Sequence, residues 1–348
     1  MPTLSHNGTS AFPILSPSKR NLPALKSQQK QTRNRIIALT FVSVLMLLVY
    51  GPLAQWFVAA DRVLYDQLAT HLPKQPLDNA FIVSVEEKKS DPESISATYG
   101  RIIEILSLSG ARRIIVTEPP EIPDDSNLPG WAAAMNSTVP VYVPTRHRLA
   151  DLARRHGFID IKADSDGVLR QSGLWQLNDG VMSPSLPLAI AFDNGEASSH
   201  HRMSSAVSVI YLSNYVAVPR IDVETMLDPA TDKTIFRDAT VFVDASPELV
   251  GSVATLPSGQ FATISEIAAS LLADVEHDKT VIAPSWVRAL EWLAPALLAI
   301  IGVLFLPERT RKDIAVLAGV AVALLLLIET LLLYVMHVRI DLGRPILI

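Results

Sequence analysis

The sequence predicts an α/β fold: a mixed, mainly parallel sheet with flanking helices in one extracytoplasmic domain, plus a small bundle of transmembrane helices. Long apolar runs at 36–59, 286–306 and 314–336 are the first observation, because each is long enough to cross the roughly 30 Å hydrocarbon core of a bilayer. The second observation concerns the interval 60–285, where short strand-like apolar segments alternate with amphipathic helical ones. That alternation is typical of parallel strands joined by crossover helices.

The composition indicates a membrane protein with one sizeable water-facing domain. Of the 348 residues, 49% are hydrophobic and only 19% are charged, and the apolar excess is concentrated in the three runs. The interval between the first two runs is long enough for a hydrophobic core of its own. The chain has no cysteine, which excludes a disulfide framework, a thiolate metal site and a cysteine nucleophile.

Basic residues beside the apolar runs predict the orientation in the membrane. The segment 1–35 carries six lysines and arginines, no acidic residue and no apolar periodicity, so we expect a disordered cytoplasmic tail. The loop 307–313 contains Arg309, Arg311 and Lys312 and is predicted to be cytoplasmic as well. The domain at 60–285 then lies in the periplasm, and the protein is a multi-pass protein of the bacterial inner membrane. Residues 337–348 form a short C-terminal tail or the start of a further span.

Strands and helices are predicted from the spacing of apolar residues. Short runs that are continuously apolar or alternate with polar residues predict strands at 80–85, 111–117, 139–143, 208–212 and 240–243, and an antiparallel hairpin formed by 157–163 and 167–177. Helical spacing predicts helices at 61–72, 94–109, 129–135, 146–156, 186–193, 223–227 and 262–274. The helix at 61–72 is expected to continue from the first span.

The stretch Asp164-Ser165-Asp166-Gly167 joins the two strands of the expected hairpin. It resembles the opening of an EF-hand calcium loop, which also requires oxygen ligands at its fifth and twelfth positions. Those positions are Val168 and Trp175, so calcium binding of that type is excluded. As a turn the stretch is well suited, because aspartate bonds to the backbone of its own turn and Gly167 accepts a positive φ.

Acidic residues follow three of the expected parallel strands. Glu86 and Glu87 follow the first, Glu118 follows the second and Asp244 follows the last. Open α/β sheets bind ligands at the carboxyl ends of their strands, so these side chains define a candidate crevice for a cation or an amine, or a set of catalytic carboxylates. The alternative is that each carboxylate caps the next helix or faces water.

Other signatures of catalysis or metal binding are absent from the sequence. Histidines of the outer domain, among them His147, His156, His200 and His201, have no HExxH-like spacing, and no Gly-x-Ser-x-Gly elbow, P-loop or Gly-x-Gly-x-x-Gly occurs. We therefore assign no catalytic residue, no metal and no cofactor, and expect a protein without enzymatic activity. Nothing in the sequence predicts nucleic-acid binding.

Glu329 lies well inside the third apolar run, where an ionisable side chain is costly and is usually paired or functional. If the second and third runs form an antiparallel hairpin that folds near Thr310, Glu329 is level with Arg288 and Glu291. We expect either an ion pair between Glu329 and Arg288 or a neutral, protonated Glu329 that faces the helix bundle.

Several stretches between 60 and 285 resemble, in order, one family of bacterial domains. The helix DRVLYDQLATHL is similar to an Asp-Arg-x-x-Tyr-Asp opening, FIVSVEE to an IVxIDE strand and GARRIIVTE to a Gly-Ala-x-x-Ile strand entry. GFIDIKADSDGVLRQSGLW resembles a glycine-led strand, an Asp-x-Asp-Gly turn and a return strand bearing an arginine, here Arg170. Together these stretches resemble the CHASE2 domain, an extracytoplasmic sensory module of bacterial membrane receptors.

The sequence departs from that family at the strand ends. Glu86 and Glu118 stand where the family usually has aspartate, and Asp244-Ala245-Ser246 stands where it usually has Gly-Ala-Ser. The ligand-binding candidates are therefore Glu86, Glu87, Glu118, Asp244 and Ser246.

The resemblance implies an inner-membrane sensor that detects an unknown signal and relays it through its transmembrane helices to a partner or to a missing output domain. Receptors of this kind generally have three spans and a cytoplasmic output domain after the sensor, whereas this chain ends at Ile348. The alternative is an accessory or scaffold subunit of an envelope complex whose outer domain binds another protein. Expected partners are the lipid bilayer, a signalling or envelope protein, a small-molecule signal and a second copy of the chain.

Overall fold

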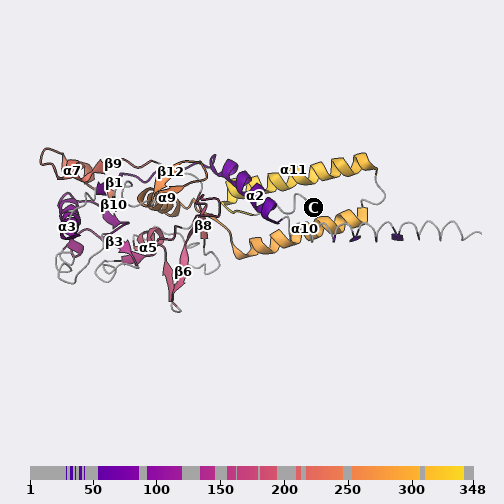
Figure 1. Cartoon of the computed structure of the whole chain (residues 1–348), viewed down its shortest axis with the longest axis horizontal. Helices are drawn as coiled ribbons and strands as arrows, with labels where there is room; N and C mark the ends of the chain where they lie inside the picture. The colour runs from indigo at the N-terminus through magenta and orange to yellow at the C-terminus, as the bar shows by residue number, and fades with distance from the viewer. Residues whose placement is uncertain are drawn as a thin grey trace, which may run out of the picture.

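The structure is a computed structural model, and the description that follows is confined to part of the chain. The residues it describes are 29, 32–33, 36, 39–40, 43, 54–85, 92–119, 134–145, 155–161, 163–178, 181–193, 209–212, 217–245, 253–305 and 310–340. The described part of the chain is elongated: an α/β domain lies at one end, and three helices extend from one side of it (Figure 1).

Six parallel strands form the central sheet of the domain, in the order β4-β3-β2-β10-β1-β9. Their bounds are β1 Ala80–Val85, β2 Arg113–Val116, β3 Val141–Pro144, β4 Arg155–Gly157, β9 Arg220–Asp222 and β10 Thr240–Ala245. β1 and β10 lie in the middle and pair along their whole length, with Val83 opposite Val243. Because every strand runs in the same direction, their carboxyl ends meet at one edge of the sheet.

Helices cover both faces of this sheet, which makes the domain a three-layer sandwich (Figure 1). α3 (Pro92–Leu108) and α7 (Val223–Leu227) pack on one face, and α5 (Leu186–Asp193) and α9 (Ile264–Glu276) on the other. Alternate side chains of one strand serve the two cores: Ile82 belongs to the α5/α9 core, whereas Val83 belongs to the α3/α7 core. Burial on both faces explains why these strands read as continuous apolar runs.

The predicted α/β class with a mainly parallel sheet is confirmed. β1, α5 and α7 have the predicted bounds, and β2, β3, β8, β10, α3 and α9 lie within three residues of theirs. The predicted helix at 129–135 falls mostly outside the described residues, as does most of the one at 146–156. The last two residues of the latter are wrong, because Arg155 and His156 begin β4.

The predicted hairpin across the Asp164 turn is also wrong as a strand pair. β5 (Gln171–Gly173) pairs antiparallel with β8 (Val209–Tyr211), and β6 (Trp175–Asn178) pairs with β7 (Val181–Pro184). No ladder joins the described residues of 157–161 and 163–177. Alternation identifies a strand but not its partner, and these partners are supplied by segments later in the chain. Three further short elements, β11 (Val253–Thr255), β12 (Phe261–Thr263) and the 3-10 helix η4 (Lys233–Phe236), were not predicted.

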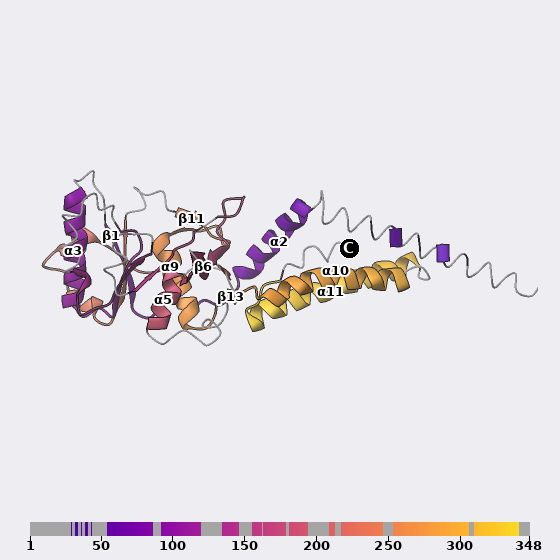
Figure 2. The ribbon, with the colours of Figure 1, turned by 90° about the horizontal axis from the view of Figure 1, so that it is seen from below.

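Three helices extend from the domain on one side. α2 (Ala54–Ala69) contains the end of the predicted first span and most of the helix predicted at 61–72, whereas most of 36–53 lies outside the described residues. α10 (Ser285–Phe305) leads away from the domain and α11 (Arg311–Met336) returns beside it, as both ribbon views show (Figures 1 and 2). A capping box between Thr310 and Asp313 begins α11.

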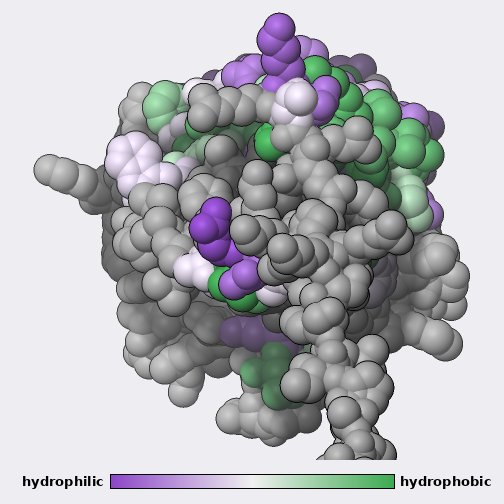
Figure 3. Space-filling model, turned by 90° about the vertical axis from the view of Figure 1, so that its right-hand side faces the viewer, coloured by the Kyte–Doolittle hydropathy of each residue, from purple (hydrophilic) through white to green (hydrophobic). Residues whose placement is uncertain are grey.

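Within the described residues, one helix is long and apolar enough to cross a membrane: Lys312–Met336, with a mean hydropathy of 2.7. Many of its apolar side chains are exposed, among them Val316, Val320, Leu324, Leu327, Leu331 and Val335. In the end-on view, the described apolar side chains gather at the top, on the side where α11 lies (Figure 3). The second predicted span forms the 21-residue helix α10 but does not meet the same criterion, so a bundle of spans is not shown by the fold.

Gly157 ends β4 where the strand meets the start of α5. A Cβ built on this residue would lie 2.5 Å from Leu186 Cα and 2.6 Å from Leu186 N, so no side chain fits. The close approach explains why a glycine opens the stretch GFIDI.

We predict that Gly157→Ala destabilises the folded chain by about 2 kcal/mol or more, because backbone atoms must move apart. Gly100→Ala is the matched control: Gly100 lies inside α3 with no atom within 4 Å of the added methyl, so the same change should stabilise by about 0.5–1 kcal/mol. Chemical unfolding of the purified full chain measures both. Equal effects of the two variants would contradict the close approach.

Candidate functional site

The carboxyl ends of the central strands bring two of the predicted acidic residues together. Asp244 is the penultimate residue of β10, at this edge of the sheet. Glu118 follows β2, which pairs with β10. Their side chains form a hydrogen-bonded pair. Glu86, Glu87 and Ser246, which were predicted to join them, lie outside the described residues.

Asp244 is enclosed at this edge, with only 1% of its surface exposed. Burial is the main reason that its pKa rises to about 7, and the hydrogen bond and charge of Glu118 raise it further. The Arg220 guanidinium, whose Nη2 lies 3.8 Å from Asp244 Oδ2, and the Ser265 hydroxyl act in the opposite direction. Asp244 therefore keeps its proton at mildly acidic pH.

Hydroxyl groups and the start of α9 close the crevice around this pair. Thr117 Oγ1 and Ser265 Oγ are 2.6 Å apart, and Arg220 donates to Ser84 Oγ at 2.6 Å and to Thr263 Oγ1 at 3.1 Å. Thr263 and Glu266 form the capping box of α9, so the N-terminal N–H groups of that helix bond to its own side chains. Within the part of the chain that the structure describes, no cluster of three or more His, Asp or Glu side chains suits a metal ion.

The acidic turn is held by an arginine. Gly167 has φ +82°, its N–H donates to Asp164 O at 2.9 Å, and Asp164 N–H donates to Val168 O at 2.9 Å. The Arg170 side chain is 5% exposed and donates from Nη1 to Asp164 Oδ2 and to Asp166 Oδ1, both at 2.9 Å. The hydrogen bond from Arg170 lowers the pKa of the Asp166 carboxyl to about 2, so this carboxylate stays ionised.

The same arginine binds the helix that leads from the first predicted span. Arg170 Nε and Nη2 donate to the two carboxylate oxygens of Asp66 on α2, both at 2.8 Å, in a bidentate pair. Arg62, one turn earlier on α2, donates to Ser165 Oγ at 3.0 Å and lies 3.5 Å from Asp164. Five charged side chains thus join α2 to the turn, and we call this group the Arg170 cluster (Arg62, Asp66, Asp164, Asp166 and Arg170).

A second arginine joins α2 to the residues that follow α11. Arg339 Nη2 donates to Asp61 Oδ2 at 2.6 Å, and the guanidinium carbon lies 4.0 Å from the centre of the Tyr65 ring and 4.6 Å from that of Tyr211. Tyr65 O–H donates to Leu212 O at 2.7 Å, beside the end of β8. Burial and the charge of Asp61 act in opposite directions on Arg339, and its pKa is raised on balance. We call this group the Arg339 cluster (Asp61, Tyr65, Tyr211 and Arg339).

Backbone pairing strengthens this second connection. β13 (Val281–Ile282) pairs with β8, and Ile282 also exchanges hydrogen bonds of 2.9 Å with His337 and Arg339, the residues just after α11. The side chains of Val338 and Ile340 are buried against Val287 at the start of α10. The beginning of α10 and the end of α11 are therefore both fixed to the domain.

The residues that the sequence predicts to be intramembrane (Arg288, Glu291 and Glu329) lie in α10 and α11. Glu329 is 6% exposed and Glu291 is partly buried, while the side chain of Arg288 lies outside the described residues. The pairing of Glu329 with Arg288 stays a prediction.

Five residues of the two clusters were not predicted as site residues from the sequence: Asp61, Arg62, Tyr65, Asp66 and Arg339. A signal was present for four of them, because DRVLYD places Asp61 and Tyr65 one helical turn apart, and likewise Arg62 and Asp66. No local pattern marks Arg339, whose partner Asp61 lies 278 positions earlier.

The fold is thus a parallel α/β sandwich that is joined by ion pairs, on one side, to α2 and to the segment that follows α11, a helix long and apolar enough to cross a membrane. The chain belongs to the CHASE2 domain family, whose family model matches residues 39–306. Neither a curated protein nor a solved structure matches the chain significantly. CHASE2 domains are extracytoplasmic sensory domains, and this chain therefore carries one.

We predict that replacing Asp244 by asparagine removes a pH dependence of stability. The carboxyl keeps its proton to about pH 7 in the folded chain but only to about pH 4 when unfolded, so unfolding releases a proton and stability falls as the pH rises from 4 to 7. The loss reaches at most about 4 kcal/mol, taking about 1.4 kcal/mol per pKa unit. Chemical unfolding of the full chain at pH 4 to 8 measures it.

The exposed Asp78 supplies the control, because Asp78→Asn should leave the pH profile of the wild-type chain unchanged. Superimposable profiles of the wild-type chain and Asp244→Asn would show that the carboxyl is not held protonated at this edge.

Proposed function

We propose that this chain is an inner-membrane sensor whose outer domain relays an extracytoplasmic signal through its transmembrane helices to a partner or to a missing output domain. Membership of the CHASE2 family supports the sensory part. The observation that carries the relay is the joining of α2 to the domain by both the Arg170 cluster and the Arg339 cluster. Any rearrangement of the domain at these clusters must move α2 or break the ionic contacts.

The proposal includes three spans, at 36–59, 286–306 and 314–336. α10 starts at the domain and α11 ends at it, which supports a membrane hairpin whose connecting loop, 307–313, is on the cytoplasmic side. The tail 1–35 is cytoplasmic and the domain 60–285 periplasmic in this topology. A multi-pass arrangement of this kind puts all three helices next to one another directly beneath the domain.

The relay requires two arrangements of the domain for which the signal has unequal affinity. The Arg339 cluster is suited to a coupled change because it includes residues from α2, from β8 and from the segment after α11. Its guanidinium is stabilised by one carboxylate and two aromatic rings, so a shift of one element leaves a buried cation without part of its surroundings. No step of this proposal is catalytic.

A scaffold role in an envelope complex is the second candidate. The hairpin β6–β7 presents Leu177 and Met182, which are 64% and 41% exposed and directly opposite each other, as an apolar pair. A scaffold would bind an envelope protein through this hairpin and copurify with it in a fixed ratio. A sensor would not require such a stable complex. A second copy of the chain is a further candidate partner.

We predict that Arg170→Gln loosens α2 and destabilises the chain by about 3 kcal/mol, because breaking a buried ion pair leaves Asp66 and the turn uncompensated. The chain has no cysteine, so Val63→Cys, at an exposed position of α2, takes a single spin label. The label should become more mobile in Arg170→Gln and in Asp66→Asn, measured by electron paramagnetic resonance of the full chain in nanodiscs.

The double variant Asp66→Asn/Arg170→Gln should add little to either single change, since both act on one contact. Arg101→Gln, an exposed arginine on α3, is the matched control. Unchanged label mobility in all variants would contradict the proposed relay through α2.

A further inference from the structure

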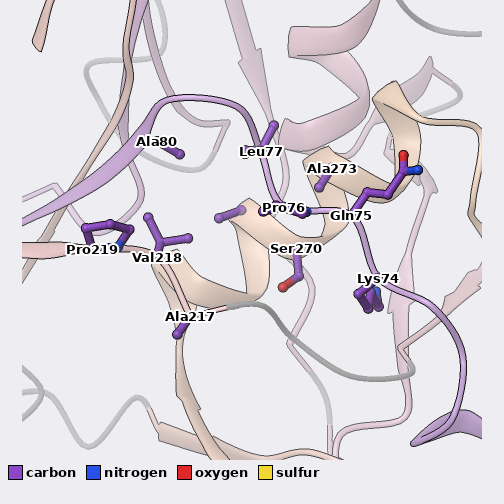
Figure 4. Close-up of a pocket in the computed structure, with 11 residues that line it drawn as sticks. Lys74, Gln75, Pro76, Leu77, Ala80, Ala217, Val218, Pro219, Ser270 and Ala273 are labelled. Atoms are coloured by element: carbon purple, nitrogen blue, oxygen red, sulfur yellow. The ribbon is translucent and has the colours of Figure 1, made fainter.

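A pocket lies where the connector from α2 to β1 crosses α9. Its walls come from the connector (Lys74 to Leu77 and Ala80), from the segment 217–219 before β9 and from one face of α9, as Figure 4 shows. Its volume is about 60 Å³. The pocket lies where β1 and β9 begin, whereas Asp244 and Glu118 lie where their strands end. No residue lines both the pocket and that crevice.

Most of the lining is apolar, with Leu77, Val218, Pro219 and two alanines of α9 among its residues. A volume of this size accepts a few atoms of a small ligand, or several waters at about 10–15 Å³ each. A buried water needs two to four polar partners, and these walls offer few. The polar groups of the pocket therefore determine what it binds.

Two polar side chains enter the pocket from opposite walls. Ser270 is 6% exposed, and its hydroxyl has no hydrogen-bond partner among the described residues. In Figure 4 this hydroxyl points away from the α9 ribbon, toward the side where Ala217 lies. A buried hydroxyl without a partner costs stability unless something in the pocket completes it.

Lys74 is the second of these groups. Its ammonium side chain is 10% exposed and pairs with Asp274 of α9, its one hydrogen-bond partner in the described part of the chain. An ammonium has three N–H donors and no acceptor, so two donors are left for a further acceptor. A ligand that accepts hydrogen bonds from both the Lys74 ammonium and the Ser270 hydroxyl would provide the acceptor that each of these groups lacks.

We propose that this pocket binds a short-chain aliphatic monocarboxylate, with its carboxylate between Lys74 and Ser270 and its alkyl chain against Leu77, Val218 and the alanines of α9. The positive charge of Lys74 selects an anion over a neutral amide of the same shape, because a hydrogen bond between charged groups is roughly twice as strong as a neutral one. The carboxylate of Asp274 limits the charge of the ligand, since a dianion would be repelled by it. One negative charge and a short chain are therefore the properties the pocket accepts.

The location of the pocket connects it to the relay, and this step rests on the proposed function. The connector that forms one wall begins just after α2 and ends at β1, which pairs with β10 and β9 in the six-stranded sheet. Asp274, which holds Lys74, also lies close enough to Tyr65 of the Arg339 cluster to raise its pKa electrostatically. A carboxylate that competes with Asp274 for Lys74 therefore acts on the connector directly after α2 and on a carboxylate near Tyr65.

The test is binding of propionate and of propionamide, as probes of equal shape, to the full chain in nanodiscs by saturation-transfer NMR. The wild-type chain should bind propionate and discriminate against propionamide at least tenfold. Ser270→Ala should weaken propionate binding about tenfold, and Lys74→Gln should abolish the discrimination. Ser258→Ala, at a partly exposed serine in the β11–β12 turn, is the matched control and should bind as the wild-type chain does.

Lys74→Gln also removes the partner of Asp274, so thermal unfolding is measured for each variant, and Ser270→Ala carries the test if Lys74→Gln fails to fold. Equal binding of the two probes, binding of neither, or unchanged propionate binding in Ser270→Ala would each overturn the proposal. The mobility of α2 in the Asp66 and Arg170 variants is measured without ligand. Failure of carboxylate binding therefore leaves the relay standing, and failure of the relay leaves the binding result standing.

Discussion

Two arginines that cannot lose their charge are buried where the sensory domain meets α2, and the remainder of the architecture is arranged around them. A guanidinium removed from water is stable only when carboxylates or aromatic faces replace its hydration. Arg170 has three carboxylates, of which Asp66 comes from α2, and Arg339 has Asp61 of α2 and the rings of Tyr65 and Tyr211. The helix is therefore held to the domain at two points by contacts whose loss would expose an unpaired charge.

Helical geometry explains why one short motif can serve both arginines. Asp61 and Tyr65 are four residues apart and face Arg339, while Arg62 and Asp66, also four apart, face the acidic turn. The two faces lie side by side on α2, so a small rotation of the helix would weaken both clusters. This is the physical content of the proposed relay, and the capture of a carboxylate by Lys74 would act on the connector immediately after the same helix.

The sheet was predictable where its signal is local. β1 was predicted to the residue because 80–85 is buried on both faces and reads as an uninterrupted apolar run. The meeting of Glu118 and Asp244 was predictable too, because carboxyl ends of neighbouring parallel strands share an edge. Strand pairing was not: the alternation after Gly167 is the same whether the partner is the preceding segment or β8. The bond between Arg339 and Asp61 spans almost the whole chain, and no periodicity encodes it.

Hydrogen exchange of the full chain in nanodiscs, comparing the wild-type chain with Arg339→Met, tests most directly whether α2, β8 and the segment after α11 behave as one unit. Methionine fills most of the volume of the arginine but leaves Asp61 without its cation. We expect exchange to rise together in 60–69, in 209–212 and in the last turn of α11, with little change in β2 and β3. A rise confined to 337–340 would contradict the coupling of α2 to the membrane hairpin through Arg339.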